Sequence, residues 1–294
     1  MEMKITAENG KAKFSSTFTE YISFQGIPIT IKDEKEAHRL IRETFTQAVH
    51  DRIKTARPMG ALLSGGLDSS LVASLLAREL KKQGRKLRTF SIGMPGATDR
   101  KYAEMVAEKI GSEHKHVEFS EEDFLNAVEE VVGVTETFDI TTIRATTGNY
   151  LIGKWVSENT DIKVLLIGDG SDELCSGYMY FFNAPNAEDS HKENIRLIED
   201  IHMYDVLRAD RGVADNGVEA RVPFLDKHFI KLYLSIDPAL RVPKMCDAGI
   251  VMEKALLRDS FKDEDLLPRE VLYRRKEAFS DGVSGLKRSW YVVL

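Results

Sequence analysis

The chain has 294 residues, of which 43% are hydrophobic and 30% are charged, and its formal net charge at pH 7 is −6. This balance is typical of a soluble globular protein with one large domain or two small ones, and it argues against a nucleic-acid-binding surface. The absence of an 18-residue apolar run argues against a membrane-spanning helix. Cys175 and Cys246 have no disulfide or metal spacing, and no leader-like segment precedes them. We therefore expect free thiols and a cytoplasmic protein.

Residues 1–35 contain short β-like runs at 21–24 and 27–31 and are predicted to form an arm or a small hairpin. Apolar residues then recur at helical spacing from Glu34 to Lys54, which predicts a helix with one buried face. A short apolar run that ends at Leu63 is the first predicted strand of the core.

The next stretch, ALLSGGLDSS at Ala61–Ser70, has little side-chain bulk at its centre and runs into apolar residues at helical spacing. It predicts a strand, a tight turn and a helix. The adjacent glycines let the backbone approach a ligand, and the free N–H groups of a helix N-terminus favour an anion. A carboxylate among phosphate-binding groups repels the anion unless a cation lies between them, so Asp68 predicts a Mg²⁺ ion.

No lysine follows the glycines, so the turn lacks the side chain that holds a γ-phosphate in a Walker A loop. A serine-rich turn without lysine suits the pyrophosphate that leaves when a nucleotide is split at its α-phosphate. The alternative is an ordinary strand-to-helix turn in which Asp68 or Ser69 caps the helix.

Strands and helices alternate through the middle of the sequence. Strands are predicted at 87–93, 114–119 and 163–167, and helices at 99–110, 120–132 and 146–159. Asp99 is the predicted N-cap of the first of these helices, Gly111 its end, and Ser120 opens a capping box. The alternation predicts an α/β fold with a parallel sheet flanked by helices, which binds ligands at the carboxyl ends of its strands. After about residue 190 the pattern becomes mainly helical.

A second glycine-rich turn, GDGSDELCSGY, follows the strand at 163–167. It places Asp169, Asp172 and Glu173 within five residues. Three close carboxylates repel one another unless a cation neutralises them, so Asp172 is the predicted second ligand of the Mg²⁺ ion at Asp68. The alternative is a solvated acidic turn.

Two further clusters carry weaker signals. In TTIRAT at 141–146, Arg144 suits a carboxylate or a phosphate, with a surface arginine as the alternative. In RRKEAFSDGV at 274–283, Lys276 suits the charge that builds on an α-phosphate, with a solvated basic face as the alternative.

The remaining polar pairs are interpreted mainly as structural. Glu219 and Arg221 fit a structural ion pair as well as a functional one. His114 and His116 share one face of a strand but have no third ligand nearby, so we favour a structural role over metal binding.

Together these motifs resemble the synthetase domain of glutamine-dependent asparagine synthetases, within the ATP-pyrophosphatase (PP-loop) superfamily. The similarity runs from about residue 36 to 283, and its motifs are LLSGGLDSS, TTIRA, GDGSDE, APNAEDSHKE, HMYDVLRAD, GVEARVPFLD, MEKALLR and KEAFSDGV. It implies one domain over 36–294 with a sheet like that of the adenine nucleotide alpha hydrolases. The implied reaction uses ATP to convert aspartate to β-aspartyl-AMP and pyrophosphate, and ammonia then yields asparagine and AMP.

The resemblance also implies the site residues. The nucleotide site would consist of Leu63, Ser64, Gly65, Gly66, Asp68, Ser69, Ser70, Ile92, Ile167 and Gly168. Asp68 and Asp172 would hold Mg²⁺, and the backbone at Leu63 and Ile92 would bind adenine. The implied catalytic residues are Lys276, Asp169, Arg144 and Thr141. Lys276 would stabilise charge on the α-phosphate, while Thr141 and Arg144 would shape the aspartate pocket.

Several residues depart from the family pattern. Asp169 stands where the family has a glutamate thought to gate and deprotonate ammonia, and Ile167 replaces a serine. The family's glutaminase domain begins with a cysteine nucleophile, but this sequence has no cysteine before Cys175. We therefore expect the chain to use ammonia, either free or from a separate glutaminase partner.

Two alternatives stay open. One is a relative that adenylates a different carboxylate, as β-lactam synthetases do. The other is a catalytically impaired nucleotide-binding subunit or fragment, which Asp169 and a C-terminal end shorter than the family's would favour. In each case we expect no nucleic-acid or membrane partner.

Overall fold

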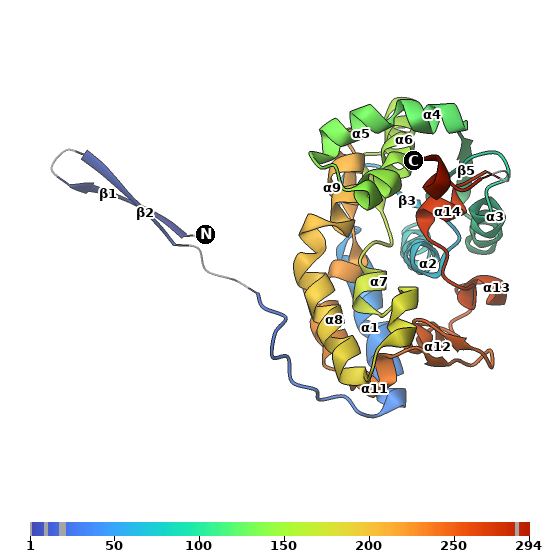
Figure 1. Cartoon of the computed structure of the whole chain (residues 1–294). Helices are drawn as coiled ribbons and strands as arrows, with labels where there is room; N and C mark the ends of the chain where they lie inside the picture. Colours follow the sequence, from blue (N-terminus) through green and yellow to red (C-terminus); the bar gives the residue numbers. More distant parts are fainter. Residues whose placement is uncertain (1, 9–10, 18–21, 286–287) are drawn as a thin grey trace.

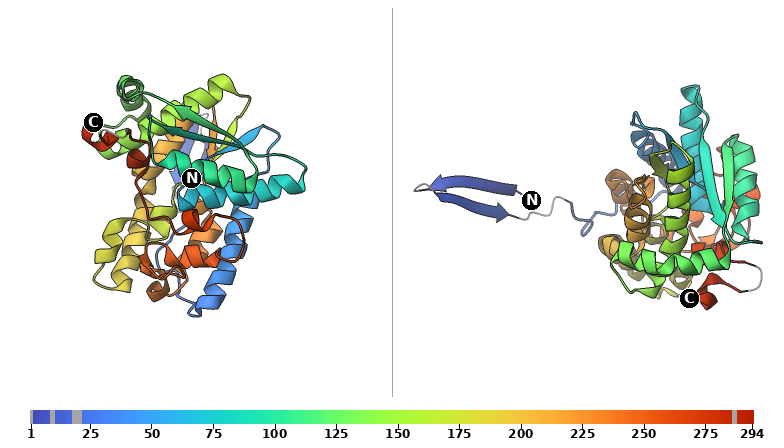
Figure 2. Two further views of the ribbon diagram at one scale, coloured as in Figure 1. Left: turned by 90° about the vertical axis from the view of Figure 1, so that its right-hand side faces the viewer. Right: turned by 90° about the horizontal axis from the view of Figure 1, so that it is seen from above.

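The computed structural model describes residues 2–8, 11–17, 22–285 and 288–294. A five-stranded sheet with the order β5-β4-β3-β6-β7 lies at its centre, with helices on both faces (Figures 1 and 2). All neighbouring strands of this sheet are parallel. The strands are β3 (Met59–Leu62), β4 (Arg88–Gly93), β5 (Glu113–Glu118), β6 (Val164–Leu166) and β7 (Glu219–Arg221).

The helices differ widely in length. The longer ones are α1 (Glu34–Asp51), α2 (Leu67–Lys82), α3 (Asp99–Ile110), α5 (Val128–Thr135), α6 (Ile140–Asn159), α8 (Ala187–Asp200), α9 (Asp205–Ala214) and α10 (Lys227–Leu234). The shorter ones are α4 (Glu121–Asn126), α7 (Ser171–Leu174), α11 (Pro238–Arg241), α12 (Ala255–Ser260), α13 (Arg269–Leu272), α14 (Phe279–Gly282) and α15 (Trp290–Val293). A small antiparallel ladder joins β8 (Lys244–Met245) to β9 (Val251–Met252).

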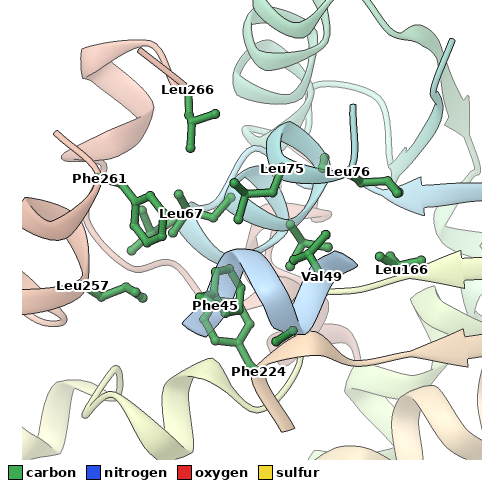
Figure 3. Close-up of a cluster of buried hydrophobic side chains, with 14 of the residues drawn as sticks. Phe45, Val49, Leu67, Leu75, Leu76, Leu166, Phe224, Leu257, Phe261 and Leu266 are labelled. Atoms are coloured by element: carbon green, nitrogen blue, oxygen red, sulfur yellow. The ribbon is translucent and has the colours of Figure 1, made fainter. Parts of the chain in front are cut away.

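One face of the sheet is covered by α1, α2, α3 and α10, whose apolar side chains form one hydrophobic cluster. At its centre Phe45 packs on Phe224 with ring centroids 4.2 Å apart (Figure 3). Val164 and Leu166 of β6 belong to this cluster, whereas Leu165 between them belongs to the cluster on the other face. This alternation follows from the two-residue period of a strand, and it explains why β6 is apolar throughout.

The opposite face is covered by α4, α5, α6, α9 and α15. Phe90 and Ile92 of β4 are buried there together with Ile152 of α6. Phe124 of α4 packs against Trp290 of α15, with ring centroids 5.3 Å apart. The C-terminal helix α15 therefore lies beside α4 in this layer (Figure 1). The predicted α/β fold, with a parallel sheet flanked by helices and a mainly helical C-terminal part, is confirmed.

One strand was not predicted, and one helix is longer than predicted. The strand β7 was not predicted, because three residues with one apolar side chain between two charges give no strand signal. The helix α6 begins at Ile140 and not at Thr146, because Asp139 caps it by accepting a hydrogen bond from the Thr142 N–H at 2.7 Å. The motif at 141–146 is therefore helical.

The predicted helix ends are confirmed in part. Gly111 ends α3 in the left-handed conformation at φ 65°, and Ser120 forms a capping box with Asp123. The helix after Ser120 is interrupted at Ala127. The prediction that Asp99 is an N-cap is wrong, because its carboxylate is buried and pairs with Arg274 instead.

The N-terminal strands lie elsewhere than the sequence pattern suggested. β1 (Glu2–Glu8) and β2 (Lys11–Thr17) form an antiparallel pair. Within the described residues 22–31 there is no strand, although Ile31 forms an isolated bridge with Ile236, and Tyr21 lies outside the described residues. The division of the chain at residue 35 stays a prediction.

Both cysteines are buried free thiols, as predicted. Burial raises the pKa of the Cys175 thiol to about 12, so it stays protonated at neutral pH. Among the described residues, no helix has the length and the apolar character needed to cross a bilayer.

Candidate active site

A cavity of about 580 Å³ opens at the carboxyl ends of the central strands. The segments that leave β3, β4 and β6 line one side of it, and residues from α9, the start of α12 and the 274–281 segment line the other. This is the edge at which open parallel sheets bind their ligands. Both glycine-rich turns therefore meet there, as the sequence predicts.

In the first turn, Gly65 occupies a position that no other residue would fit. Gly65 has φ 77°, and a Cβ atom there would overlap with the backbone of Tyr102 and Ala103. Gly66 is the N-cap of α2, so the alternative in which Asp68 or Ser69 caps the helix is wrong. The Ser64 and Ser69 hydroxyl oxygens lie 3.0 Å apart at the cavity wall. The turn thus presents hydroxyl groups and helix N–H groups to the cavity.

Most of the predicted nucleotide residues line the cavity, and two do not. Those that line it are Leu63, Ser64, Gly66, Asp68, Ser69, Ile92, Ile167 and Gly168. Gly65 shapes the turn from behind, and Ser70 is fully buried in the first turn of α2. Gly168 approaches α2 so closely that a Cβ atom there would lie 2.7 Å from the Ser69 nitrogen. The two glycine-rich turns are therefore packed directly against each other.

Asp68 and Asp172 come together as predicted, and a lysine lies between them. The Lys254 Nζ atom is 2.8 and 2.6 Å from the two oxygens of Asp68 and 2.6 Å from Asp172 Oδ1. The Nζ atom of Lys276 is 2.6 Å from the other oxygen of Asp172. Burial alone would raise the pKa of Asp172, but the two ammonium groups outweigh it and hold this pKa well below its usual value.

The oxygen donors of Asp68 and Asp172 are of the kind that Mg²⁺ prefers. In the part of the chain that the structure describes, no three His, Cys, Asp or Glu side chains are grouped so as to hold a metal ion. A Mg²⁺ ion at these two carboxylates would therefore need further ligands from a bound phosphate or from water. The donor set fits, and the assignment of the two residues to Mg²⁺ stays a prediction.

A second acidic group lies beside this cluster. One carboxylate oxygen of Asp169 is buried without a hydrogen-bond partner, and burial raises the pKa of Asp169 to about 6 although Arg208 opposes the shift. Burial and the neighbouring Asp172 also raise the pKa of Glu173, which accepts a hydrogen bond from the Tyr178 hydroxyl. Asp169 is therefore a carboxylate that can exchange a proton near neutral pH.

The structure does not bring Thr141 and Arg144 to the cavity. Thr141 is exposed at the start of α6. The Arg144 guanidinium lies over the ring of Tyr291 at 4.6 Å, and Arg144 is not among the cavity-lining residues of α6, which include Asn149. At about 100° per residue, Arg144 and Asn149 are about 140° apart around the helix axis.

Other cations line the cavity that the sequence analysis did not assign. Arg208 of α9 pairs with Asp205, and its Nε atom is buried without a partner. Arg274 pairs with the buried Asp99 at 2.7 Å and stacks on Tyr102 at 4.1 Å, which fixes the segment that carries Lys276. Arg208 and Lys254 lie in two of the motifs that carry the family resemblance, HMYDVLRAD and MEKALLR, but no role was assigned to them.

The polar residues interpreted as structural have partners within the protein. Arg221 pairs with Glu219 at 2.7 Å on β7. His114 lies within hydrogen-bond distance of Thr89 and Ser91, at 3.0 and 3.1 Å. Burial lowers the pKa of His114 to about 4, so it is neutral at pH 7.

A parallel sheet whose first strand runs through a glycine- and serine-rich turn into a helix N-terminus defines an α/β protein of the nucleotide-binding class. The family model described as asparagine synthase matches residues 40–196 and 183–290. The chain therefore belongs to the asparagine synthase family.

Known relatives agree with this assignment. The chain is 48% identical to the asparagine synthetase [glutamine-hydrolyzing] of Cricetulus griseus over 274 residues, which are 92% of this chain and 47% of the relative. The proteins of the same name from Homo sapiens and Gallus gallus are 49% and 50% identical over 256 residues, 86% of this chain and 45% of each relative. The chain thus spans about half the length of these curated relatives.

Solved structures resemble the chain only weakly. A predicted subunit of a tRNA methyltransferase from Methanocaldococcus jannaschii has a TM-score of 0.32 at 18% identity, covering 60% of this chain and 73% of its own. The NMN synthetase of Francisella tularensis has a TM-score of 0.31 at 15% identity, covering 69% and 93%.

Proposed function

We propose that this chain catalyses the ATP-dependent amidation of aspartate to asparagine through β-aspartyl-AMP, with release of pyrophosphate and AMP. The observation that carries the proposal is one cavity that combines an anion-binding turn, two lysine ammonium groups and a proton-exchanging carboxylate. Membership of the asparagine synthase family supports the same reaction.

The nucleotide half of the reaction would use the sheet side of the cavity. The hydroxyls of Ser64 and Ser69 and the N–H groups at the start of α2 would bind the pyrophosphate, and the backbone at Leu63 and Ile92 would contact adenine. Lys276 has its ammonium group at the cavity wall. It would stabilise the charge that builds on the α-phosphate as the aspartate side chain attacks. A Mg²⁺ ion held by Asp68 and Asp172 would neutralise phosphate charge.

The aspartate substrate needs a cation for its α-carboxylate, and Arg208 is better placed for this than Arg144. Both arginines have a buried Nε atom without a partner, but Arg208 lines the cavity, whereas Arg144 stacks on Tyr291 and does not line it. A guanidinium binds a carboxylate with two parallel hydrogen bonds. When the substrate carboxylate binds Arg208, the ion pair between Asp205 and Arg208 would break in part, or Asp205 would bind the substrate ammonium group.

The second half-reaction needs a neutral amine. Ammonia forms a bond to the β-carbonyl carbon while the bond from that carbon to the AMP oxygen breaks. The attacking nitrogen must lose one proton to become the amide nitrogen, and Asp169, whose pKa burial raises to about 6, would accept that proton. We propose that the nitrogen arrives as ammonia, either free or delivered by a glutaminase partner.

The direct test is aspartate-dependent release of pyrophosphate from ATP, with and without ammonium, while asparagine is measured in the same sample. The proposal predicts pyrophosphate and asparagine in equal amounts when ammonium is present. Pyrophosphate without asparagine would limit the chain to the adenylation step. No pyrophosphate with aspartate, but release with another carboxylate from a panel, would favour the β-lactam synthetase-like alternative. ATP binding without any turnover would favour a nucleotide-binding subunit.

A further inference from the structure

Lys254 is an unusual lysine in two independent ways. Its side chain is only 1% exposed, and a buried ammonium costs several kcal/mol unless it is paired. Its backbone lies in the left-handed region at φ 55°, a conformation that costs a residue other than glycine about 1 kcal/mol or more. The ammonium group lies at the cavity wall, where two carboxylates contact it.

That point is defined by two carboxylates from different parts of the fold. Asp68 belongs to the first turn of α2 and Asp172 to α7, and the ammonium contacts both within 2.8 Å. Ser171 also donates to Asp68 at 2.7 Å. Two carboxylates that face each other repel unless a cation joins them, so Lys254 supplies the charge that lets them approach.

The surrounding backbone is shaped to allow this contact. A Cβ atom at Gly177 would overlap with Asp172 Oδ1 and with the Cε atom of Lys254. With Lys276 on the outer oxygen of Asp172, the two carboxylates and the two ammonium groups form a cluster with no net charge. Such a cluster offers a free divalent cation no excess negative charge.

We propose that Lys254 is the resident cation of the nucleotide-free site, a positioning residue that holds Asp68 and Asp172 together and competes with a free divalent cation for them. Metal would then bind these carboxylates only together with the phosphates of a nucleotide, whose charge draws the lysine ammonium groups away from them. This inference rests on the proposed nucleotide site and is independent of the amidation reaction.

The test measures binding of Mn²⁺, as a paramagnetic substitute for Mg²⁺, by the loss of its free electron paramagnetic resonance signal. Without nucleotide, Lys254→Met is expected to bind one Mn²⁺ ion at least about tenfold more tightly than the unmodified chain, because the carboxylates lose their competing cation. Lys262→Met removes the same charge from an exposed pair with Asp247 and is expected to change nothing. Equal or weaker Mn²⁺ binding by Lys254→Met would overturn the proposal.

A second measurement uses the unmodified chain, in case Lys254→Met does not fold. One Mn²⁺ ion per chain is expected to bind in the presence of a non-hydrolysable ATP analogue and much more weakly in its absence. Tight binding of one Mn²⁺ ion without nucleotide, or none with it, would overturn the proposal. Failure to form asparagine, with the Mn²⁺ results as expected, would instead contradict only the proposed reaction.

Discussion

The two sides of the cavity are built in different ways. On the sheet side, two turns present backbone and hydroxyl groups, and their shape depends on glycines such as Gly65 and Gly168 that no side chain could replace. On the helical side, long charged side chains such as Lys276 and Arg208 reach in from segments far away in the sequence. In the proposed function, the sheet side would therefore hold the anion, whereas the helical side would supply the charge that the chemistry needs.

The largest effect is expected on the helical side, from Lys276→Met. Removal of an ammonium group aimed at the developing α-phosphate charge should lower aspartate-dependent pyrophosphate release about 10³-fold, with ATP binding changed only a few-fold. The rate is measured by pyrophosphate release and the binding by calorimetry. Lys192→Met, at an exposed pair on α8, serves as the matched control. A loss of less than about tenfold would remove Lys276 from the transition state.

The second expected effect concerns Asp169 and is a matter of pH. Its pKa of about 6 means that it is a carboxylate at pH 7 and becomes protonated, and unable to accept a proton, as the pH falls below 6. At subsaturating ammonium, the concentration of free ammonia falls about tenfold for each unit by which the pH drops. A plot of the logarithm of the amidation rate against pH should therefore have a slope of about one above pH 6. Below pH 6 the slope should be about two, because protonation of Asp169 adds a second factor of about ten per unit.

Asp169→Asn is the matched variant for that measurement. It should amidate about 10²-fold more slowly and show a slope of about one throughout, because no carboxylate titrates. Adenylation, measured as pyrophosphate release, should change much less. An unmodified chain with a single slope across pH 5–8 would contradict the role of Asp169 as proton acceptor.

A third prediction compares two arginines directly. Arg208→Ala should raise the KM for aspartate about 50-fold, in line with loss of a charge-assisted pair of about 2 kcal/mol, and leave the KM for ATP nearly unchanged. Arg144→Ala should affect the KM for aspartate only a few-fold, because this side chain stacks on Tyr291 outside the cavity. The reverse order of effects would restore the assignment that the resemblance implied.

The smallest effect is expected on the sheet side. Ser69→Ala removes one hydroxyl from a turn that keeps its N–H groups, so the KM for ATP should rise about three- to tenfold, which corresponds to about 1 kcal/mol. Val72→Ala, one turn further along α2 and fully buried, tests whether an effect on stability alone produces the same change. If Ser69→Ala leaves the KM for ATP unchanged, the hydroxyl does not bind the phosphates.

The same contrast explains what the sequence could predict. Ser64, Gly66, Asp68 and the second turn were found because a strand, a turn and a helix N-terminus are encoded by neighbouring residues. The place of Arg208 at the cavity was not predicted, because it depends on how α9 packs against the sheet, which no local period encodes. The same holds for Lys254, because its motif MEKALLR does not reveal that its ammonium group lies between Asp68 and Asp172.

The position of Arg144 shows how a small shift in an element changes a site. The helix α6 starts six residues earlier than predicted, so the 141–146 motif lies on a regular helix whose cavity face carries Asn149. The position of the first turn was less sensitive, because Gly66 and the end of β3 determine the start of α2 within one or two residues. Local signals therefore predicted the two glycine-rich turns that line the cavity, whereas the residues on its helical side depend on tertiary packing.

The most direct test of the central claim follows one oxygen atom. Aspartate labelled with ¹⁸O in its β-carboxylate is incubated with ATP, Mg²⁺ and ammonium, and the AMP is examined by mass spectrometry. If the carboxylate attacks the α-phosphate and ammonia then displaces AMP, one ¹⁸O atom passes to AMP for each asparagine formed. Asparagine formed with unlabelled AMP, or with the label in inorganic phosphate, would contradict the β-aspartyl-AMP route.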